Sequence, residues 1–339
     1  DTSPAKFLNI QCEVCHGAYK SHGSTNPAMT IDYSAELCEK CHTGSHDFSY
    51  SKSAHVDSMS DLLASGHASN NCLHCMSTQG FLGLPVTLNT TNLQSVSCVA
   101  CHDPHSHKYD AQLRYENSTV LCGKCHTGTF HPQAEFFTDS PHSKAGLECT
   151  DCHGEGTHLS HGAAASVMNH TWGVYEMYYP YNQTADKEPV VCSTCHTQSW
   201  ATSQLTKIQS LTTSLIVNVT GVINDAKAAI VITEKTTGSD QAKISLAKDT
   251  VSKAEGYLKS VQNDGSKGFH NPEETFRVLS IATLLAAEAK SRAVEASNQA
   301  QVISLQAQVA NVQNIGMAGA VAALIAGLAI GIVVQRMRK

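Results

Sequence analysis

The sequence predicts a mainly α-helical protein built from two unlike parts. All fourteen cysteines of the 339-residue chain occur before residue 196. The segments between them are rich in Gly, Ser, Thr, Asn and His and show little of the alternation typical of strands, which indicates loops and short helical turns. After Trp200 cysteine is absent, and apolar residues recur at the spacing of helices. A loop-rich first part followed by long helices is therefore expected.

Two helices are predicted first in this second part, because apolar residues recur at helical spacing in 205–223 and again in 244–261. Gly238 and Asp240 interrupt the pattern between them, and Gly265 opens a turn after the second run. The sequence therefore predicts a helical domain or stalk at residues 201–314.

A third helix is predicted to start at Asn271-Pro272. A polar residue precedes a proline at the first helical position, and Glu273 and Glu274 lie at the positive end of the helix dipole. Residues 273–315 contain neither Gly nor Pro, so one long helix is expected. Two helices joined by a kink are the alternative.

The C-terminal segment Ile315–Val334 carries no charge and is followed by a basic tail at 336–339. It is long enough to span a bilayer, and no other segment is expected to be. A transmembrane helix at 315–335 is predicted, with a buried helix as the alternative. Because basic flanks mark the cytoplasmic side, the rest of the chain is expected outside.

Each cysteine belongs to a Cys-x-x-Cys pair, and His follows six of the seven pairs. The pairs are Cys12 and Cys15, Cys38 and Cys41, Cys72 and Cys75, Cys98 and Cys101, Cys122 and Cys125, Cys149 and Cys152, and Cys192 and Cys195. The following residues are His16, His42, Met76, His102, His126, His153 and His196. Cys-x-x-Cys-His is the attachment signature of haem c, in which two thioethers hold the porphyrin and the His binds iron. Seven covalent haem groups are expected, in a multihaem cytochrome c domain at residues 1–200.

Three other uses of paired cysteines explain the pattern less well. Structural zinc sites take four ligands from two such pairs, which accounts neither for an odd number of pairs nor for the histidines. A thioredoxin-like site needs one pair, and a disulfide framework would not place every cysteine three residues from its partner. Because haem c is attached outside the cytoplasm, an exported chain is expected, and a start at Asp1 fits cleavage of a leader.

Each iron needs a second axial ligand, and twelve of the nineteen histidines are candidates. His67 and His142 stand shortly before attachment cysteines, and His105 is preferred over His107 in the run after His102. His158 or His161 follows the loop after His153. The candidates ranked highest are His67, His105, His142, His158 and His170. His22, His46, His55 and His131 are not separable from one another by sequence.

Met76 breaks the motif and leaves three interpretations open. It binds iron and raises that haem's potential above those of haems with two His ligands, or a more distant His binds instead, or the site is empty. Retention of both cysteines and of His67 upstream argues against an empty site.

The segment from Lys267 to Leu279, which contains Gly268-Phe269-His270-Asn271-Pro272, resembles a stretch near the C-terminus of the cytochrome c nitrite reductases and the octahaem hydroxylamine oxidoreductases. The resemblance implies that His270 is an axial haem ligand and that long helices flank it. Those reductases carry a Cys-x-x-Cys-Lys motif at the active haem, which this chain lacks, so an open catalytic iron is not indicated.

The expected function is electron transfer by a membrane-anchored, extracytoplasmic heptahaem cytochrome without catalytic turnover of its own. In haem number and anchor the chain resembles the multihaem cytochromes that methanogens pair with the Rnf complex. That resemblance implies a membrane redox complex, a quinone-like carrier such as methanophenazine and other redox proteins as partners. A net charge of −6 argues against nucleic acid. The alternative is a nitrite- or hydroxylamine-type reductase with one open haem.

Overall fold

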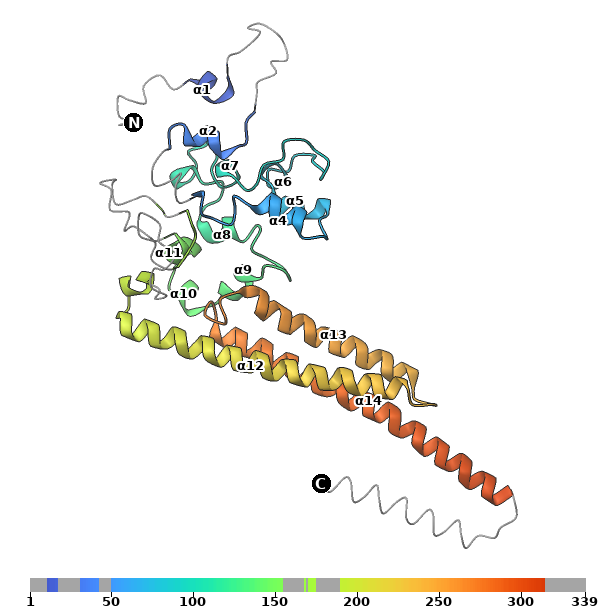
Figure 1. Ribbon diagram of the computed structural model, residues 1–339. Helices are drawn as coiled ribbons and strands as arrows, with labels where there is room; N and C mark the ends of the chain where they lie inside the picture. Colours follow the sequence, from blue (N-terminus) through green and yellow to red (C-terminus); the bar gives the residue numbers. More distant parts are fainter. Residues whose placement is uncertain are drawn as a thin grey trace. The chain divides into compact units, whose positions relative to one another are not determined.

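The computed structural model describes residues 11–17, 31–42, 50–154, 168, 170–174 and 190–314. The chain divides into two compact units, Asp1–Lys207 and Ile208–Lys339. The described residues are mainly helical and form no strand, as the sequence predicts (Figure 1). The domain boundaries predicted at residues 200 and 314 remain predictions.

The first unit consists of short helices joined by loops. Its α-helices are α1 (Cys12–His16), α2 (Ala35–Glu39), α4 (Ser58–Ala64), α5 (Leu73–Met76), α6 (Thr78–Phe81), α7 (Cys98–Cys101), α8 (Ser118–Cys122), α9 (Gln133–Phe137), α10 (Pro141–Lys144) and α11 (Cys149–His153). Single 3₁₀ turns occur at η2 (Asn70–Cys72), η3 (Asp110–Gln112) and η4 (Val190–Thr194). Six of the α-helices contain at least one cysteine of a pair, so the attachment motifs themselves form much of the regular structure.

Polar side chains, rather than a large apolar core, fix several of these helices. Asn117 caps α8 by accepting a hydrogen bond from the Val120 amide at 2.9 Å, and Ser140 caps α10 in the same way. Between α8 and α11, the Ser118 hydroxyl lies 3.0 Å from a Glu148 carboxylate oxygen. Buried apolar packing is concentrated where Met59, Leu62 and Leu73 form one cluster.

The described residues of the second unit form three long helices, α12 (Gln198–Glu234, which starts in the first unit), α13 (Gln241–Asp264) and α14 (Pro272–Asn314). The interruptions between α12 and α13 and between α13 and α14, together with the start of α14 at Pro272, confirm the helix predictions. Helix α14 is unbroken over its described length. Asp240 caps α13, accepting from the Ala242 amide at 3.0 Å, and Gly265 ends it in the left-handed conformation.

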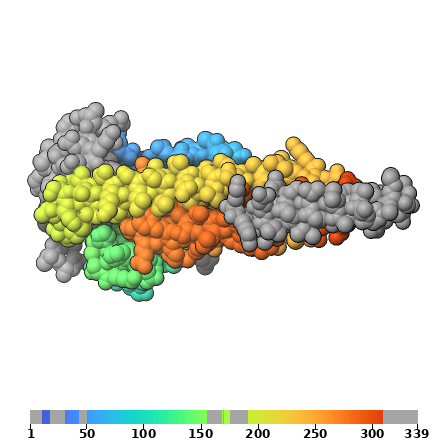
Figure 2. All heavy atoms as spheres, turned by 90° about the horizontal axis from the view of Figure 1, so that it is seen from below, coloured from blue at the N-terminus to red at the C-terminus, as the bar shows by residue number. Residues whose placement is uncertain are grey.

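Small side chains make up much of the core of α13 and α14, beside larger ones such as Ile244, Val261 and Leu279. Fully enclosed alanines on the two helices are Ala247, Ala254, Ala282, Ala286, Ala289, Ala293 and Ala296. Small side chains let helix backbones approach closely and lose no rotamer freedom on burial. Helix α12 lies beside α14, and the Thr233 hydroxyl donates to the Ala293 carbonyl at 3.0 Å (Figures 1 and 2). An exposed ion pair, Lys290 with Asp225 at 2.9 Å, also joins these two helices.

Within the described ranges, α12 is the one helix that is long and apolar enough to cross a membrane by length and composition. This corrects the expectation that 315–334 is the chain's single candidate. Buried helices of soluble proteins pass the same test, so the finding is weak evidence of a span. The predicted transmembrane helix at 315–335 and the tail at 336–339 lie outside the described residues.

Candidate functional site

The attachment motifs fold as single helical turns. The amide of the motif histidine donates to the carbonyl of the first cysteine at 2.9 Å in His42, His102, His126 and His196. This bond brings the histidine one turn beyond the first cysteine, and it places both thiols and the imidazole on one side of the backbone. The turns thus present the two thiols and the axial nitrogen that haem c requires.

The attachment thiols differ in how far they are covered by the protein. Cys12, Cys15, Cys41 and Cys195 are exposed, whereas Cys152 and the remaining cysteines are partly buried. No disulfide joins any of the fourteen, all of which lie in the described ranges. A thiol that is to bond a porphyrin must not be held in a disulfide, and this condition is met. The assignment of each thiol to a haem stays a prediction.

Within the part of the chain that the structure describes, no group of three or more His, Cys, Asp or Glu side chains is placed to hold a metal ion. Structural zinc needs four such protein ligands. Haem iron takes four of its ligands from the porphyrin, so two axial side chains are sufficient. The side-chain arrangement therefore fits haem better than a zinc site.

Four motif histidines each face a second histidine ring from a distant part of the chain. The ring centroids are 5.8 Å apart for His16 with His105, 6.2 Å for His126 with His55, 6.3 Å for His102 with His170 and 6.4 Å for His196 with His142. Two imidazoles that bind one metal from opposite sides, each with a metal–nitrogen bond of about 2 Å, have centroids roughly 6 Å apart. The spacing therefore fits one iron between the rings of each pair.

The structure thus brings three of the highest-ranked histidines, His105, His142 and His170, beside motif histidines. Other predicted ligands are placed differently or lie outside the described residues. His67 is exposed, and its Nδ1 lies 2.9 Å from the Ser65 carbonyl. His42 is described and exposed, whereas His158 lies outside the described residues.

His55 cannot be distinguished by sequence, yet its ring faces His126. Burial, and then the neighbouring His126, lower the pKa of His55 to about 4, so the ring is neutral at pH 7. A neutral imidazole is the form that binds iron. His131 also lies near His126, at 6.1 Å between centroids, but its side chain is exposed. No local sequence signal separates the two, because the contact with His126 is made across the fold.

Backbone carbonyls fix the tautomer of several rings. Nδ1 of His102 lies 2.7 Å from the Ala111 carbonyl, and Nδ1 of His153 lies 2.9 Å from the Trp172 carbonyl. A carbonyl only accepts, so each Nδ1 carries the hydrogen and Nε2 keeps the lone pair. Hydrogen bonds of this kind commonly orient histidines that bind metals.

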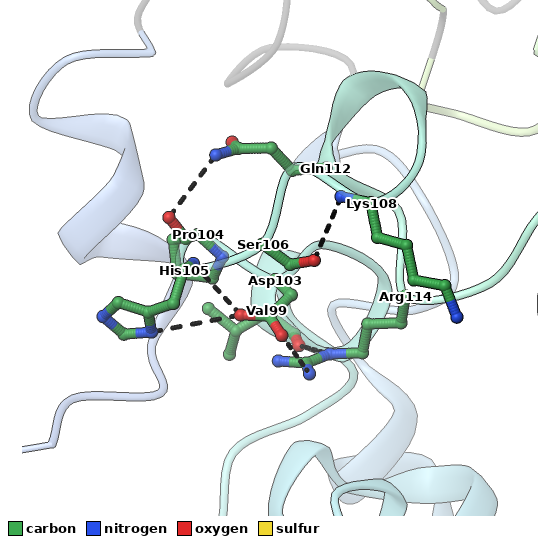
Figure 3. Close-up of polar contacts among 8 residues, drawn as sticks. All are labelled: Val99, Asp103, Pro104, His105, Ser106, Lys108, Gln112 and Arg114. Carbon is green, nitrogen blue, oxygen red and sulfur yellow. Dashed lines mark hydrogen bonds and ion pairs between the residues drawn. The ribbon is translucent and has the colours of Figure 1, made fainter.

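His105 is held by a compact polar loop after α7 (Figure 3). Its amide donates to Asp103 at 3.1 Å, and the Asp103 carboxylate also pairs with Arg114 at 3.5 Å. Arg114 in turn donates to the Val99 carbonyl inside α7 at 2.8 Å. The loop thus fixes the backbone at His105 relative to the attachment turn, while the ring remains exposed toward His16.

Sequence reasoning misses Trp172, which lies among three histidines. Its ring centroid is 5.1 Å from that of His170 and 6.2 Å from that of His55, and its carbonyl accepts from His153. Its indole nitrogen is buried without a hydrogen-bond partner. An unsatisfied buried donor is costly, and a haem propionate is an acceptor of the right chemistry for it.

Thiols of different motifs also lie within hydrogen-bonding distance of one another. The thiol of Cys125 donates to Cys75 and lowers the pKa of Cys75 to about 6. The thiol of Cys98 likewise donates to Cys38 and lowers its pKa to about 7, and Cys122 pairs with Cys149. Each of these thiols is predicted to carry a porphyrin edge, and porphyrins carried by touching thiols would be close neighbours.

Met76 takes part in apolar packing. Its side chain packs against the cluster of Met59, Leu62 and Leu73, and its carbonyl accepts from the Ser58 hydroxyl at 2.9 Å. His74, inside the same motif, is exposed and stacks on Phe81 at 5.8 Å. These contacts leave the three interpretations of Met76 open.

A family model described as cytochrome c552 matches residues 127–324. That range is more than half of the 339 residues of the chain. This chain belongs to the cytochrome c552 family. A model of the doubled CXXCH motif also matches this c552-family cytochrome, at residues 6–47 and 91–130. The protein is therefore a multihaem c-type cytochrome that binds haem c covalently through its Cys-x-x-Cys-His motifs, which decides against the zinc, thioredoxin-like and disulfide alternatives.

Two curated relatives match parts of this c552-family cytochrome. It is 25% identical over 150 residues to the protein named multiheme cytochrome MtrA of Shewanella baltica (strain OS185), a match covering 37% of this chain and 45% of MtrA. It is 29% identical over 163 residues to cytochrome c-552 of Maridesulfovibrio salexigens, covering 47% of this chain and 30% of that protein. The chain thus spans less than half the length of these relatives.

Two solved structures share the fold of this c552-family cytochrome. Outer cell wall cytochrome OcwA superposes with a TM-score of 0.58 at 23% identity, covering 82% of this chain and 70% of OcwA. Cytochrome c nitrite reductase of Desulfovibrio desulfuricans superposes with a TM-score of 0.55 at 17% identity, covering 72% and 71%. At these identities the likeness concerns the fold alone.

Proposed function

We propose that this protein is a membrane-anchored, extracytoplasmic heptahaem cytochrome that relays electrons without catalytic turnover of its own. The observation that carries the proposal is the set of four histidine pairs, each with room for one iron. An iron with two imidazole ligands has no open position for substrate, and its bonds change little when it gains or loses an electron. Such sites suit transfer of electrons rather than bond-making chemistry.

The proposed attachment residues are the fourteen cysteines of the seven pairs. The proposed first axial ligands are the residues that follow the pairs, namely His16, His42, Met76, His102, His126, His153 and His196. The proposed second ligands now include His55 opposite His126, beside the earlier candidates His67, His105, His142, His158, His170 and His270. The proposal includes a membrane anchor at 315–335. The proposed partners are a membrane redox complex such as Rnf, a quinone-like carrier such as methanophenazine, and other redox proteins.

The reductase alternative is favoured by one observation, which is that Met rather than His follows Cys75. Low-temperature electron paramagnetic resonance of the oxidised protein separates the two functions. A relay is expected to give low-spin ferric signals only, because every iron has two strong ligands. A dominant high-spin signal that changes on addition of nitrite would overturn the relay and support the reductase.

The number of haems is expected to be seven per chain, measured by pyridine haemochromogen absorbance against protein concentration. The count rests on the retention of both Cys72 and Cys75. If the parent holds six haems per chain, and replacing Cys72 and Cys75 by serine removes none of them, this site is empty.

Replacement of Met76 tests whether its sulfur binds iron. If it does, Met76→Leu keeps the packing volume but is expected to create one high-spin haem. Met76→His is expected to restore a low-spin iron at a lower potential than the parent, because thioether ligation raises the potential. Spectra of both variants identical to the parent would exclude Met76 as a ligand.

A further inference from the structure

A small polar network occupies the turn between α13 and α14. Asp264 is the last residue of α13, and its side chain is only 1% exposed. One of its carboxylate oxygens lies 2.6 Å from Nδ1 of His270, and the other accepts from the Ser266 hydroxyl. That hydroxyl also accepts from the His270 amide at 3.1 Å. The side chain and the backbone of His270 are therefore both tied to Asp264.

Local energetics disfavour a carboxylate at this position. The C-terminal end of a helix carries partial negative charge, so an acidic side chain there is repelled. Removing a carboxylate from water costs several kcal/mol unless strong hydrogen bonds replace hydration. The hydroxyl of Ser266 and the imidazole of His270 supply such bonds. Because the position disfavours a carboxylate, we explain the presence of Asp264 by its hydrogen bond to the imidazole of His270.

The turn is closely packed before His270 and capped after it. Gly268 has φ +87°, and a Cβ at this position would lie 2.4 Å from the Thr212 hydroxyl oxygen, so only glycine fits. After the histidine, Asn271 caps α14 by accepting from the Glu274 amide at 3.2 Å. His270 is thus presented from a fixed backbone between a capped helix and a closely packed glycine.

The bond from Asp264 has a defined chemical effect on the imidazole. A carboxylate only accepts, so Nδ1 carries the hydrogen and Nε2 holds the lone pair that a metal binds. The negative charge also makes the ring a stronger electron donor through Nε2. A stronger donor stabilises ferric over ferrous iron, which lowers the reduction potential.

We infer that Asp264 is a positioning residue that holds His270 as an axial haem ligand and lowers the potential of the haem that His270 serves. The inference rests on the proposed ligation by His270. It assigns to Asp264 the choice of tautomer and the basicity of the ligand, and it makes that haem easier to oxidise than one whose axial histidine bonds to a carbonyl.

Asp264→Asn in the haem-loaded, full-length protein tests the inference, because the amide keeps the shape of the side chain and loses the charge. Spectropotentiometric titration is expected to show one haem shifted upward. A tenfold change in the equilibrium between ferric and ferrous iron corresponds to about 59 mV for one electron, and a shift of about this size is expected. Asp249→Asn makes the same change at an exposed position on α13 and is expected to shift nothing. Asp264→Glu, which keeps the charge, is expected to retain the parent potential.

His270→Ala separates failure of the inference from failure of the proposed ligation. It is expected to produce one high-spin haem in the resonance spectrum. If it does, and Asp264→Asn behaves like Asp249→Asn, the role of Asp264 is refuted while the ligation stands. If His270→Ala leaves the spectrum unchanged, both are refuted.

Should Asp264→Asn fail to fold, Ser266→Ala is the second variant. It removes one donor from the carboxylate and is expected to shift the potential of the same haem downward. No shift would count against the inference.

Discussion

Replacing all fourteen cysteines by serine is expected to unfold the first unit while leaving α13 and the described part of α14 helical. In the part of that unit that the structure describes, the buried apolar side chains are Ala35, Met59, Leu62, Leu73, Ala100, Leu121, Phe136, Phe137 and Ala201. Full burial of one large apolar side chain stabilises a fold by about 1.5–3 kcal/mol. Ordering one residue costs about 1.5 kcal/mol, so this set is far too small to order the unit without the porphyrins.

Far-ultraviolet circular dichroism and limited proteolysis measure the outcome. The variant is expected to lose protease resistance before residue 200 and to keep a resistant fragment that contains α13. The parent sequence, produced without haem attachment, is the matched control and is expected to behave in the same way. A cooperative unfolding transition of the first unit in either sample would contradict the expectation.

His55→Ala is expected to convert one haem from low spin to high spin. The ring of His55 faces His126 at a spacing that fits one iron, and its low pKa keeps it neutral. Removing it leaves that iron with one protein ligand. The relay would then contain an open site, and electron transfer through the chain is expected to slow.

Two matched variants sharpen this test by electron paramagnetic resonance. His131→Ala removes the other ring near His126, and His74→Ala removes an exposed ring that stacks on Phe81. Both are expected to leave all signals low-spin. A high-spin signal in His131→Ala, with none in His55→Ala, would assign the second ligand to His131 instead.

What the sequence can predict depends on how local the cause is. The attachment turns follow from three-residue spacings, and the start of α14 follows from Asn271-Pro272 and the acids after it. Both can therefore be predicted from short segments of sequence. The pairing of histidines is set across the fold. His67 ranks high from its place before Cys72, yet it is exposed, whereas His55 is indistinguishable from other loop histidines and lies against His126. Trp172 gives no signal, because its three histidine neighbours are assembled only by folding.

The histidine pairs also have a topological consequence. In each of the four pairs an iron would tie together segments about 50–90 residues apart, which makes it a cross-link comparable to a disulfide that closes a long loop. A single closure of this length removes about 4 kcal/mol of unfolded-state entropy in the chain-entropy model. Since the four closures overlap in succession along the sequence, from His16 to His105, His55 to His126, His102 to His170 and His142 to His196, no cut between motifs would release a self-contained half. The haem domain should therefore resist division into smaller modules.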